Sequence, residues 1–308
     1  MFELNRKKGT ATKLRARFPK VHPKAELDIT FQRTLRIPDD GKDYPLPAGL
    51  GRLPLRYIED CEGELSEHAL NRGGILMPMY QSEATWIDFT CLYPMAIKIA
   101  AGKINAVTGE PWSNGLHVEP QDYMVAPEQP WLDGFSVEEG IVRQFVAEPL
   151  GHGKTVEEVM TGEAEWGGLQ IMVYPMKADE YRKRFEQPKE ELYDVPVFLR
   201  RQSDVCMSAC ESMGMAAGGR IHQEIYEDEF GIDVWDRDAA SRCFVHIANS
   251  TAYERMTGRP PPSTPITEQE YHRQGIPWFM HYAENAKALG GGQFDLLEDV
   301  RHVSSGQW

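Results

Sequence analysis

The chain has 308 residues, of which 41% are hydrophobic and 26% charged, and its formal net charge is −14. These values are typical of a folded globular protein. An acidic body repels nucleic acid and anionic membranes. No stretch approaches the roughly 18 consecutive apolar residues of a membrane helix, so we expect no membrane partner.

The five cysteines are odd in number and sparse for a disulfide scaffold. The first residues, MFELNRKKGT, lack the apolar core of a secretory signal. Together these two features favour a reducing, cytoplasmic location.

The first 24 residues differ in charge from the rest of the chain. They carry eight basic side chains and one acidic side chain, Glu3, which gives them a net charge of +7. Because this segment is polar and lacks a regular apolar pattern, we expect a mobile arm or one that docks on a partner subunit. Such an arm can also contact a polyanion. The simpler alternative is a solvated terminus attracted to the acidic body of its own chain.

Alternating polar and apolar residues are the dominant pattern along the chain. In residues 28–37, Ile29 and Phe31 fall on one face, and Asp28, Thr30 and Gln32 fall on the other, as in a strand buried on one side. Proline-rich stretches such as residues 44–54 predict extended loops. Further strands are expected at residues 85–90, 95–101, 103–107, 140–147, 169–174, 195–199 and 242–248.

The expected helices are short. Thr155 is placed to cap a helix at residues 156–160, and Thr267 begins a capping box with Glu270. Other helices are expected at residues 177–186 and 203–213. Short helices among many strands predict a β-rich α+β protein, an antiparallel β-sandwich or flattened barrel with short helical insertions and long proline-rich loops. The expected organisation is a basic arm (residues 1–24), this domain (residues 25–262) and a C-terminal segment (residues 263–308) packed on the domain.

Residues 220–228 carry the first candidate site. If this segment is extended, one face presents four groups that can donate, accept or exchange protons: His222, Glu224, Tyr226 and Asp228. A carboxylate beside an imidazole can tune it for general acid–base catalysis, and Tyr226 can donate a hydrogen bond. The alternative interpretation is the solvated face of a half-exposed antiparallel strand, which is normally polar.

The second candidate site consists of tryptophans in predicted turns. Trp112 and Trp131 follow proline, and Trp166 precedes two glycines. An indole in a turn can stack on a sugar or a base, and Asp133 beside Trp131 would supply a carboxylate for sugar hydroxyl groups. Alternatively, loop tryptophans can fold back and cap the ends of a β-sandwich.

Two other segments match ligand-site patterns only in part. In the run from Gly151 to Thr155, Glu148 stands where a phosphate-binding loop needs its first glycine, so a tight turn is favoured over nucleotide binding. Cys206, Cys210 and Met213 would share one face of a helix and suit copper(I), but such residues more often pack in a core. We therefore expect no metal ion and no cofactor.

No motif in the sequence fixes a reaction. The lack of catalytic motifs and the basic arm on an acidic body favour a non-enzymatic binding or assembly protein, a homo-oligomer held through residues 1–24. The alternative is a hydrolase of a sugar or a related polar substrate, with His222, Glu224 and Asp228 in proton transfer and a tryptophan-lined cleft.

Overall fold

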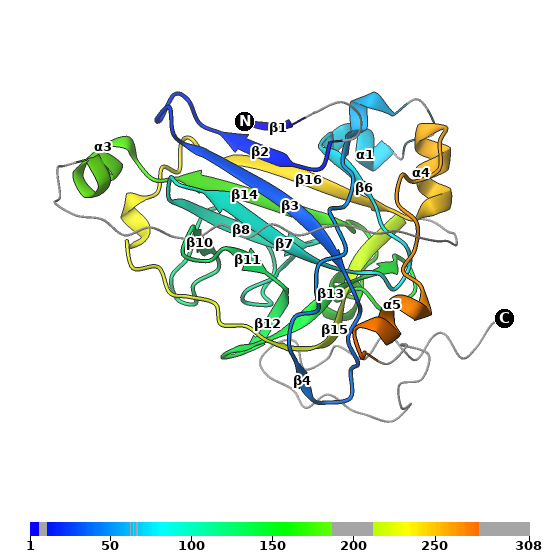
Figure 1. Ribbon diagram of the computed structural model, residues 1–308. Coiled ribbons are helices and arrows are strands. Elements are labelled where there is room, and N and C mark those ends of the chain that lie inside the picture. Colours follow the sequence, from blue (N-terminus) through cyan, green and yellow to red (C-terminus); the bar gives the residue numbers. More distant parts are fainter. Residues whose placement is uncertain (6–10, 62, 64, 66, 187–211, 277–308) are drawn as a thin grey trace.

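The computed structural model describes residues 1–5, 11–61, 63, 65, 67–186 and 212–276. Its main element is one large sheet of 16 strands with short helices around it (Figure 1). The hydrogen-bonded path along this sheet runs through β1 (Phe2–Leu4), β2 (Leu14–Arg17), β3 (Glu26–Thr34), β7 (Ala84–Cys91), β13 (Ile141–Pro149), β15 (Ser212–His222), β16 (Ser241–Ala248), β14 (Leu169–Pro175), β8 (Met95–Ala101) and β10 (Met124–Ala126), in that order. Shorter strands pair beside this path: β4 (Asp43–Tyr44), β5 (Arg56–Tyr57), β6 (Ile75–Pro78), β9 (Ile104–Asn105), β11 (Trp131–Leu132) and β12 (Gly134–Glu138).

Neighbouring strands are antiparallel apart from two short parallel pairs, β15 with β4 and β16 with β6. The prediction of a β-rich, mainly antiparallel protein is therefore confirmed. β8 lies at the predicted residues, and β3, β7, β13, β14 and β16 lie within a few residues of the predicted ones. The strand expected at residues 103–107 is reduced to β9, and the one expected at residues 195–199 lies outside the described residues.

The sheet curves so that its two ends share one core. β1 contacts β16 and β10 contacts β7, although neither pair is hydrogen-bonded along the path. In Figure 1, β3 and β7 cross in front of β14 and β8. Alternation turns one face of strands such as β3 and β7 inward, whereas β8 and β13 are buried at every position. The burial of apolar area stabilises the fold. Fully buried side chains on the two halves include Ile29, Phe31, Ile97, Ile171 and Val173.

The described helices are α1 (Glu67–Arg72), α2 (Val156–Thr161), α3 (Ala178–Tyr181), α4 (Ser250–Thr257) and α5 (Glu268–Arg273), with 3-10 turns η1 (Ile58–Asp60) and η3 (Ile232–Val234) and a π turn, η2 (Arg182–Glu186). The helix expected at residues 177–186 is thus divided between α3 and η2. None of the helices in the described ranges is long and apolar enough to cross a bilayer.

The expected helix caps have different outcomes. Thr155 caps α2 in a capping box, in which its hydroxyl accepts a hydrogen bond from the amide of Glu158 and the Glu158 carboxylate accepts one from the amide of Thr155. Thr267 is the N-cap residue of α5 but forms no side-chain capping bond, so that prediction is wrong. The helix expected at residues 203–213 is wrong at its end, because Met213 pairs within the sheet. Residues 203–211 lie outside the described part of the chain.

The described part of residues 1–24, expected as an arm, forms two strands of the sheet. β1 pairs with β2 and β2 pairs with β3, and Leu14 and Ala16 are fully buried. The basic side chains between them pair with the next strand, since Lys13 Nζ and Arg15 Nε lie 2.8 and 2.6 Å from the carboxylate oxygens of Asp28. The positive charge of this segment therefore lies on the polar face of two strands that complete one end of the sheet.

The described start of the C-terminal segment contacts the sheet. Arg33 donates a hydrogen bond of 2.6 Å to the backbone oxygen of Thr264. Tyr271 of α5 is buried, and its hydroxyl accepts a hydrogen bond of 2.9 Å from the amide of Arg36. Residues 277–308 lie outside the described part of the chain.

Candidate functional site

Residues 220–228, the first candidate site, are only partly a strand. β15 ends at His222, and residues 223–228 continue without strand pairing. The side chains of His222, Glu224 and Tyr226 are exposed, and none of them bonds to another described residue. Asp228 turns inward instead. The prediction that one extended strand presents all four side chains together is therefore wrong.

Asp228 organises a turn. Its Oδ2 accepts hydrogen bonds from the hydroxyl of Tyr123 at 2.6 Å and from Nε1 of Trp235 at 2.8 Å. Its Oδ1 accepts hydrogen bonds from the amides of Phe230 and Gly231 at 2.8 and 3.2 Å. Burial and, next, the hydrogen bond to Asp228 raise the pKa of Tyr123. With four donors around it, this carboxylate serves the local fold.

Glutamine side chains replace strand pairing beyond His222. Gln129 Nε2 donates hydrogen bonds to the backbone oxygens of Trp131 at 3.0 Å and Glu224 at 3.3 Å. Gln129 Oε1 accepts one from the amide of Tyr226 at 3.1 Å. A primary amide has donors and an acceptor, so it can satisfy backbone groups on two segments at once. The residues of the two candidate sites, some 90 positions apart in the chain, are thereby brought side by side.

The indole of Trp131 is held by the carboxyl group of Asp133. Trp131 is 40% exposed and Asp133 only 1% exposed, and Nε1 of Trp131 donates a hydrogen bond of 3.0 Å to Oδ2 of Asp133. Burial raises the pKa of Asp133 to about 7, and the bond from Trp131 opposes this only in part. Oδ1 of Asp133 is buried with no hydrogen-bond partner among the described residues.

Gln223 fixes the backbone of the same pair. Its Oε1 accepts a hydrogen bond of 2.8 Å from the amide of Asp133, and its Nε2 donates one of 3.1 Å to the backbone oxygen of Trp131. Gln223 is itself buried. The position of the indole is therefore set both by its own side-chain bond and by its backbone.

The polar face of β7 continues the site. Trp131 pairs with Asp88 and lies on the same face, because directly opposed residues of antiparallel strands point to one side. Burial raises the pKa of Asp88. Trp86 lies on this face two positions before Asp88 in β7. Its indole nitrogen is buried and has no hydrogen-bond partner among the described residues. We call Trp86, Asp88, Trp131 and Asp133 the indole–carboxyl site.

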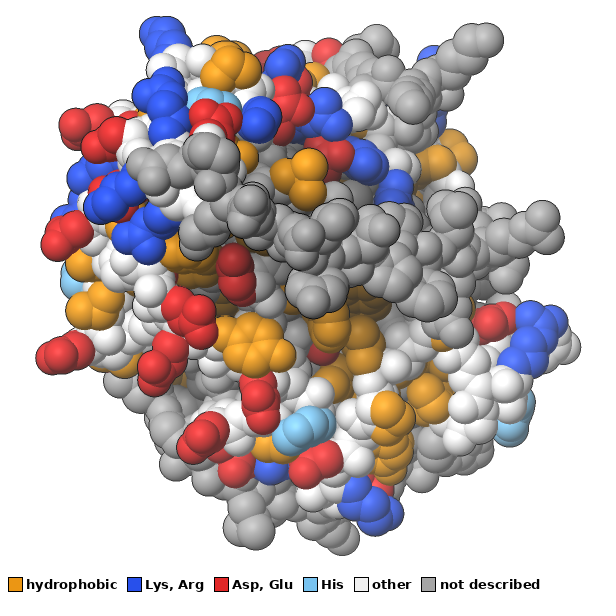
Figure 2. All heavy atoms as spheres, turned by 60° about the vertical axis from the view of Figure 1, so that its left-hand side comes forward, with side chains coloured by type: hydrophobic (Ala, Val, Ile, Leu, Met, Phe, Trp, Pro, Cys, Tyr) orange, Lys and Arg blue, Asp and Glu red, His pale blue; other side chains and the backbone are white. Residues whose placement is uncertain are grey.

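Neighbouring strands widen this surface. On β3, Thr30 lies opposite Asp88 of β7, and Gln32 lies opposite Trp86. On the other edge of β3, Arg52 forms a β-bridge with Gln32. The side of the molecule that carries β10 and β11 comes forward in Figure 2, where acidic side chains border exposed hydrophobic ones. The surface thus combines aromatic rings with hydrogen-bonding groups of both kinds.

The other two candidate tryptophans lie elsewhere. Cζ of Arg72 and Nζ of Lys103 lie 3.5 and 3.6 Å from the ring centroid of Trp166. Two groups so near one centroid must lie on opposite faces, because on one face they would overlap, so neither face of Trp166 is open for stacking. Trp112 is half-buried, with Nζ of Lys98 5.1 Å from its ring centroid.

The glycine-rich turn before α2 is filled by its own chain. The amides of Gly151 and Gly153 donate hydrogen bonds of 2.7 and 2.9 Å to Oε1 of Glu158, and the hydroxyl of Thr155 donates one of 2.7 Å to Oε2. Burial alone would raise the pKa of Glu158, but these hydrogen bonds outweigh it and lower the pKa. The carboxylate occupies the place that a phosphate would take, so the turn is structural, as the sequence pattern favours.

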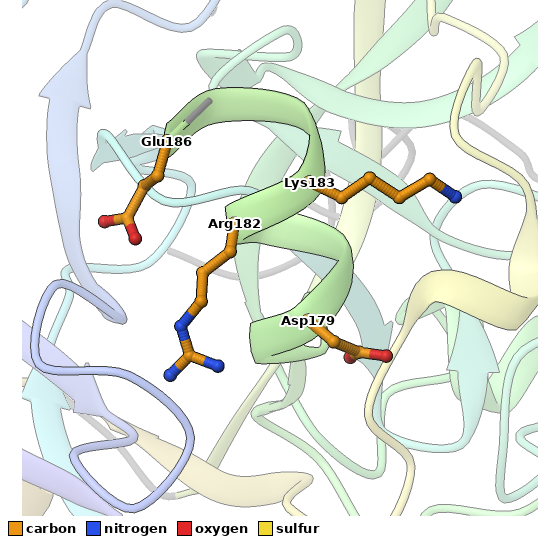
Figure 3. Close-up of a pocket in the computed structure, with 4 residues that line it drawn as sticks. All are labelled: Asp179, Arg182, Lys183 and Glu186. Atoms are coloured by element: carbon orange, nitrogen blue, oxygen red, sulfur yellow. The ribbon is translucent and has the colours of Figure 1, made fainter. Parts of the chain in front are cut away.

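A hollow of about 530 Å³ lies at α3 and η2, lined by Asp179, Arg182, Lys183 and Glu186 (Figure 3). Arg182 and Glu186 extend from one side of the helical turn, and Asp179 and Lys183 from the other. Two acids and two bases leave these four side chains with no net charge. The lining of this hollow therefore favours neither an anionic nor a cationic ligand.

The described residues contain no group of three His, Cys, Asp or Glu side chains arranged to hold a metal ion. Cys206 and Cys210 lie outside them, and Met213 is buried in β15. Burial raises the pKa of Cys91 and of Cys243 to about 12, so both stay as thiols at neutral pH.

No protein-family model, no curated protein and no solved structure shows significant similarity to this chain.

Sequence reasoning finds Trp131 and Asp133 but misses Trp86 and Asp88. The signal is present in the expected strand at residues 85–90, where Trp86, Asp88 and Thr90 alternate with Ile87 and Phe89. A polar face that includes a tryptophan in a strand half buried in the core is a candidate binding surface. Its position beside Trp131 depends on long-range pairing that the alternation does not specify.

Proposed function

We propose that the protein binds a hydroxyl-rich ligand, such as a neutral oligosaccharide, at the indole–carboxyl site. The observation that carries this proposal is the 3.0 Å hydrogen bond from the exposed indole of Trp131 to the buried carboxyl group of Asp133. A large exposed ring leaves apolar area in water, and a buried carboxyl group loses its hydration. The exposed indole and the buried carboxyl group each cost stability, and residues that reduce stability in this way are typical of functional sites.

The chemistry of the surface fits a sugar. A fixed indole presents a flat apolar face to the C–H side of a pyranose ring. Asp88, Gln32 and Arg52 supply acceptors and donors for hydroxyl groups along the neighbouring strands. Because the indole is fixed before binding, little side-chain entropy is lost when a ligand stacks on it. In this proposal the curved sheet is an open sandwich, with the site on an outer face.

Binding is favoured over hydrolysis. The hydrolase alternative needs His222, Glu224 and Asp228 to act together, whereas Asp228 accepts four hydrogen bonds of the local fold. His222 and Glu224 are exposed and are not bonded to each other. Assembly through residues 1–24 has less support as well, because Lys13 and Arg15 are paired with Asp28.

The test is isothermal titration calorimetry with four neutral tetrasaccharides: maltotetraose, cellotetraose, xylotetraose and tetra-N-acetylchitotetraose. We expect at least one to bind, and Trp131→Ala to weaken that binding about tenfold, which corresponds to ~1.4 kcal/mol of stacking. Phe185→Ala is the matched control, because Phe185 is 49% exposed but lies on η2. No binding to any of the four, or equal weakening by both substitutions, would remove the proposal.

A further inference from the structure

A second cluster of chemically active side chains lies in the loop between β9 and β10. The side chain of His117 is 53% exposed, and its Nδ1 lies 2.8 Å from Oδ2 of Asp122. The amide of His117 also donates a hydrogen bond of 2.9 Å to Oδ1 of Asp122. Asp122 is buried, so an outward-facing imidazole is anchored on an inward-facing carboxylate.

Lys98 of β8 fixes that carboxylate. The Lys98 ammonium group is almost fully buried and donates a hydrogen bond to Oδ2 of Asp122. It also lies 3.0 Å from the backbone oxygen of Ser113, 3.1 Å from its hydroxyl and 2.9 Å from the backbone oxygen of Gly115. Three N–H groups are engaged by these acceptors, so Lys98 acts as the counter-ion of Asp122 and not as a base for Ser113.

This arrangement decides which nitrogen of His117 is available. A carboxylate that accepts a hydrogen bond from an ammonium group has no proton to give, so Nδ1 of His117 must be the donor to Asp122. The lone pair of the neutral imidazole is then on Nε2, which bonds to no described residue. The hydroxyl of Ser113 lies 3.4 Å from Nδ1, on the side already taken by Asp122, so it is not placed for activation.

We propose that His117 is a catalytic nucleophile that accepts acyl groups at Nε2, with Asp122 as its positioning residue. With an activated ester, Nε2 forms a bond to the carbonyl carbon while the bond from that carbon to the leaving oxygen breaks, and the leaving group departs as an alcoholate or phenolate. Because Nδ1 keeps its proton, the intermediate is an acyl-imidazolium; water adds to its carbonyl carbon, the C–N bond breaks, and the proton that water releases goes to the departed alcoholate or phenolate or to solvent. The products are a carboxylic acid, an alcohol or phenol, and free His117, with water as the only other reactant consumed.

This activity goes beyond the proposed ligand site and does not depend on it. The loop of His117 is joined to residues 226–228 through Gln121, whose Nε2 donates a hydrogen bond of 3.1 Å to the backbone oxygen of Tyr226. Its Oε1 accepts one of 2.8 Å from the amide of Asp228. These bonds hold the loop in place without involving the imidazole, so His117 can be changed without removing them.

The probe is p-nitrophenyl acetate, with the release of p-nitrophenolate followed at pH 7.5. We expect His117→Gln to lower the second-order rate constant about tenfold, since a positioned group contributes factors of 10² or more and the other histidines give a background. His152→Gln is the matched control, because His152 is exposed on a turn and bonds to no described residue. It should leave the rate unchanged.

A second measurement on the unaltered protein keeps the positioning role of Asp122 testable. Long-range ¹H–¹⁵N correlation spectra at pH 8.5 should show His117 as the Nδ1–H tautomer, whereas His152 should show the Nε2–H tautomer that free imidazole side chains prefer. If His117 had only a structural role, it could adopt either tautomer, and replacing it would not slow ester cleavage. The Nδ1–H tautomer and the slower cleavage by His117→Gln together therefore identify a positioned nucleophile. The Nε2–H tautomer at His117, or equal ester cleavage by His117→Gln and the unaltered protein, overturns the proposal.

Discussion

Trp131 and Asp133 are joined by a hydrogen bond of 3.0 Å between an indole that is 40% exposed and a carboxyl group that is 1% exposed. The two residues are two positions apart, on the same side of the chain where β11 ends. Burial raises the pKa of Asp133 to about 7. The carboxyl group therefore changes its charge near neutral pH while it supports the ring that the proposed ligand would contact.

The first prediction concerns the pH dependence of stability. The Asp133 carboxyl group ionises near 3.8 when unfolded and near 7 when folded. Between these pH values the unfolded state loses its proton first, so the free energy of unfolding falls as pH rises from about 4 to about 7 and is unaffected by this group below that window.

Asp133→Asn lacks this effect and can still accept the bond from Trp131. Its stability relative to the unaltered protein should rise between pH 4 and pH 8 by up to about 4 kcal/mol, measured by urea denaturation. A difference that does not change with pH would contradict the raised pKa.

The second prediction concerns the loop before α2. The carboxylate of Glu158 accepts hydrogen bonds from two glycine amides and from Thr155, and its pKa is lowered because these bonds outweigh burial. Its stabilising effect is present above the unfolded pKa and is lost as pH falls through the folded pKa. Glu158→Gln should destabilise the protein by about 2 kcal/mol at pH 7 and by less at pH 3. The exposed Glu163→Gln is the control; if both variants melt alike at pH 7, the role of Glu158 is refuted.

The third prediction concerns the buried ion pair of Arg33 and Glu83. Nε of Arg33 donates a hydrogen bond of 2.7 Å to Oε1 of Glu83, and the amide of Tyr80 donates one of 3.1 Å to Oε2. Burial raises the pKa of Glu83, and Arg33 opposes this. Glu83→Leu alone leaves a buried cation without its partner and should cost about 3–5 kcal/mol. The double variant Arg33→Met with Glu83→Leu should regain most of that loss in denaturant titrations. A double variant that is less stable than the single one would show that the pair is net stabilising.

The fourth prediction distinguishes a strand from an arm at the N-terminus. Leu14 and Ala16 of β2 are fully buried in the core, so deleting residues 1–24 removes core packing and exposes the edge of β3. We expect a loss of at least about 3 kcal/mol in the free energy of unfolding. Lys13→Gln, which removes one partly exposed ion pair, should cost under about 1 kcal/mol. A truncated protein that keeps its melting temperature would restore the mobile-arm interpretation.

Much of the sheet could be predicted because its strands follow one of two patterns. β3 and β7 alternate because they bury mainly one face, whereas β8 and β14 are buried on both faces, carry apolar residues at nearly every position and match their predicted ranges closely. The N-terminal strands were missed because β2 has only four residues and its basic side chains dominate the composition. The start of β15 was missed, and a helix ending at Met213 is expected in its place, because pairing with β13 and β16 decides the conformation there and a local sequence pattern does not show that pairing.

The candidate site could be predicted only in parts. Residue type and spacing identify two separate groups, Trp131 with Asp133 and the segment at residues 220–228. The contact between these two groups depends on the side chains of Gln129 and Gln223. Glutamine side chains that replace a backbone ladder carry no sequence signature. His117 was missed for a similar reason, because Lys98, the counter-ion of its partner Asp122, comes from a buried strand in which every other residue is apolar.

The most direct test of the central claim is an NMR titration that follows the indole N–H signals of the seven tryptophans as a tetrasaccharide is added. We expect the Trp131 signal to shift most, and the signals of Trp166, covered by two cations, and of Trp235, bound to Asp228, to stay in place. A saccharide that binds while the Trp131 signal remains unchanged would show that the ligand site lies elsewhere.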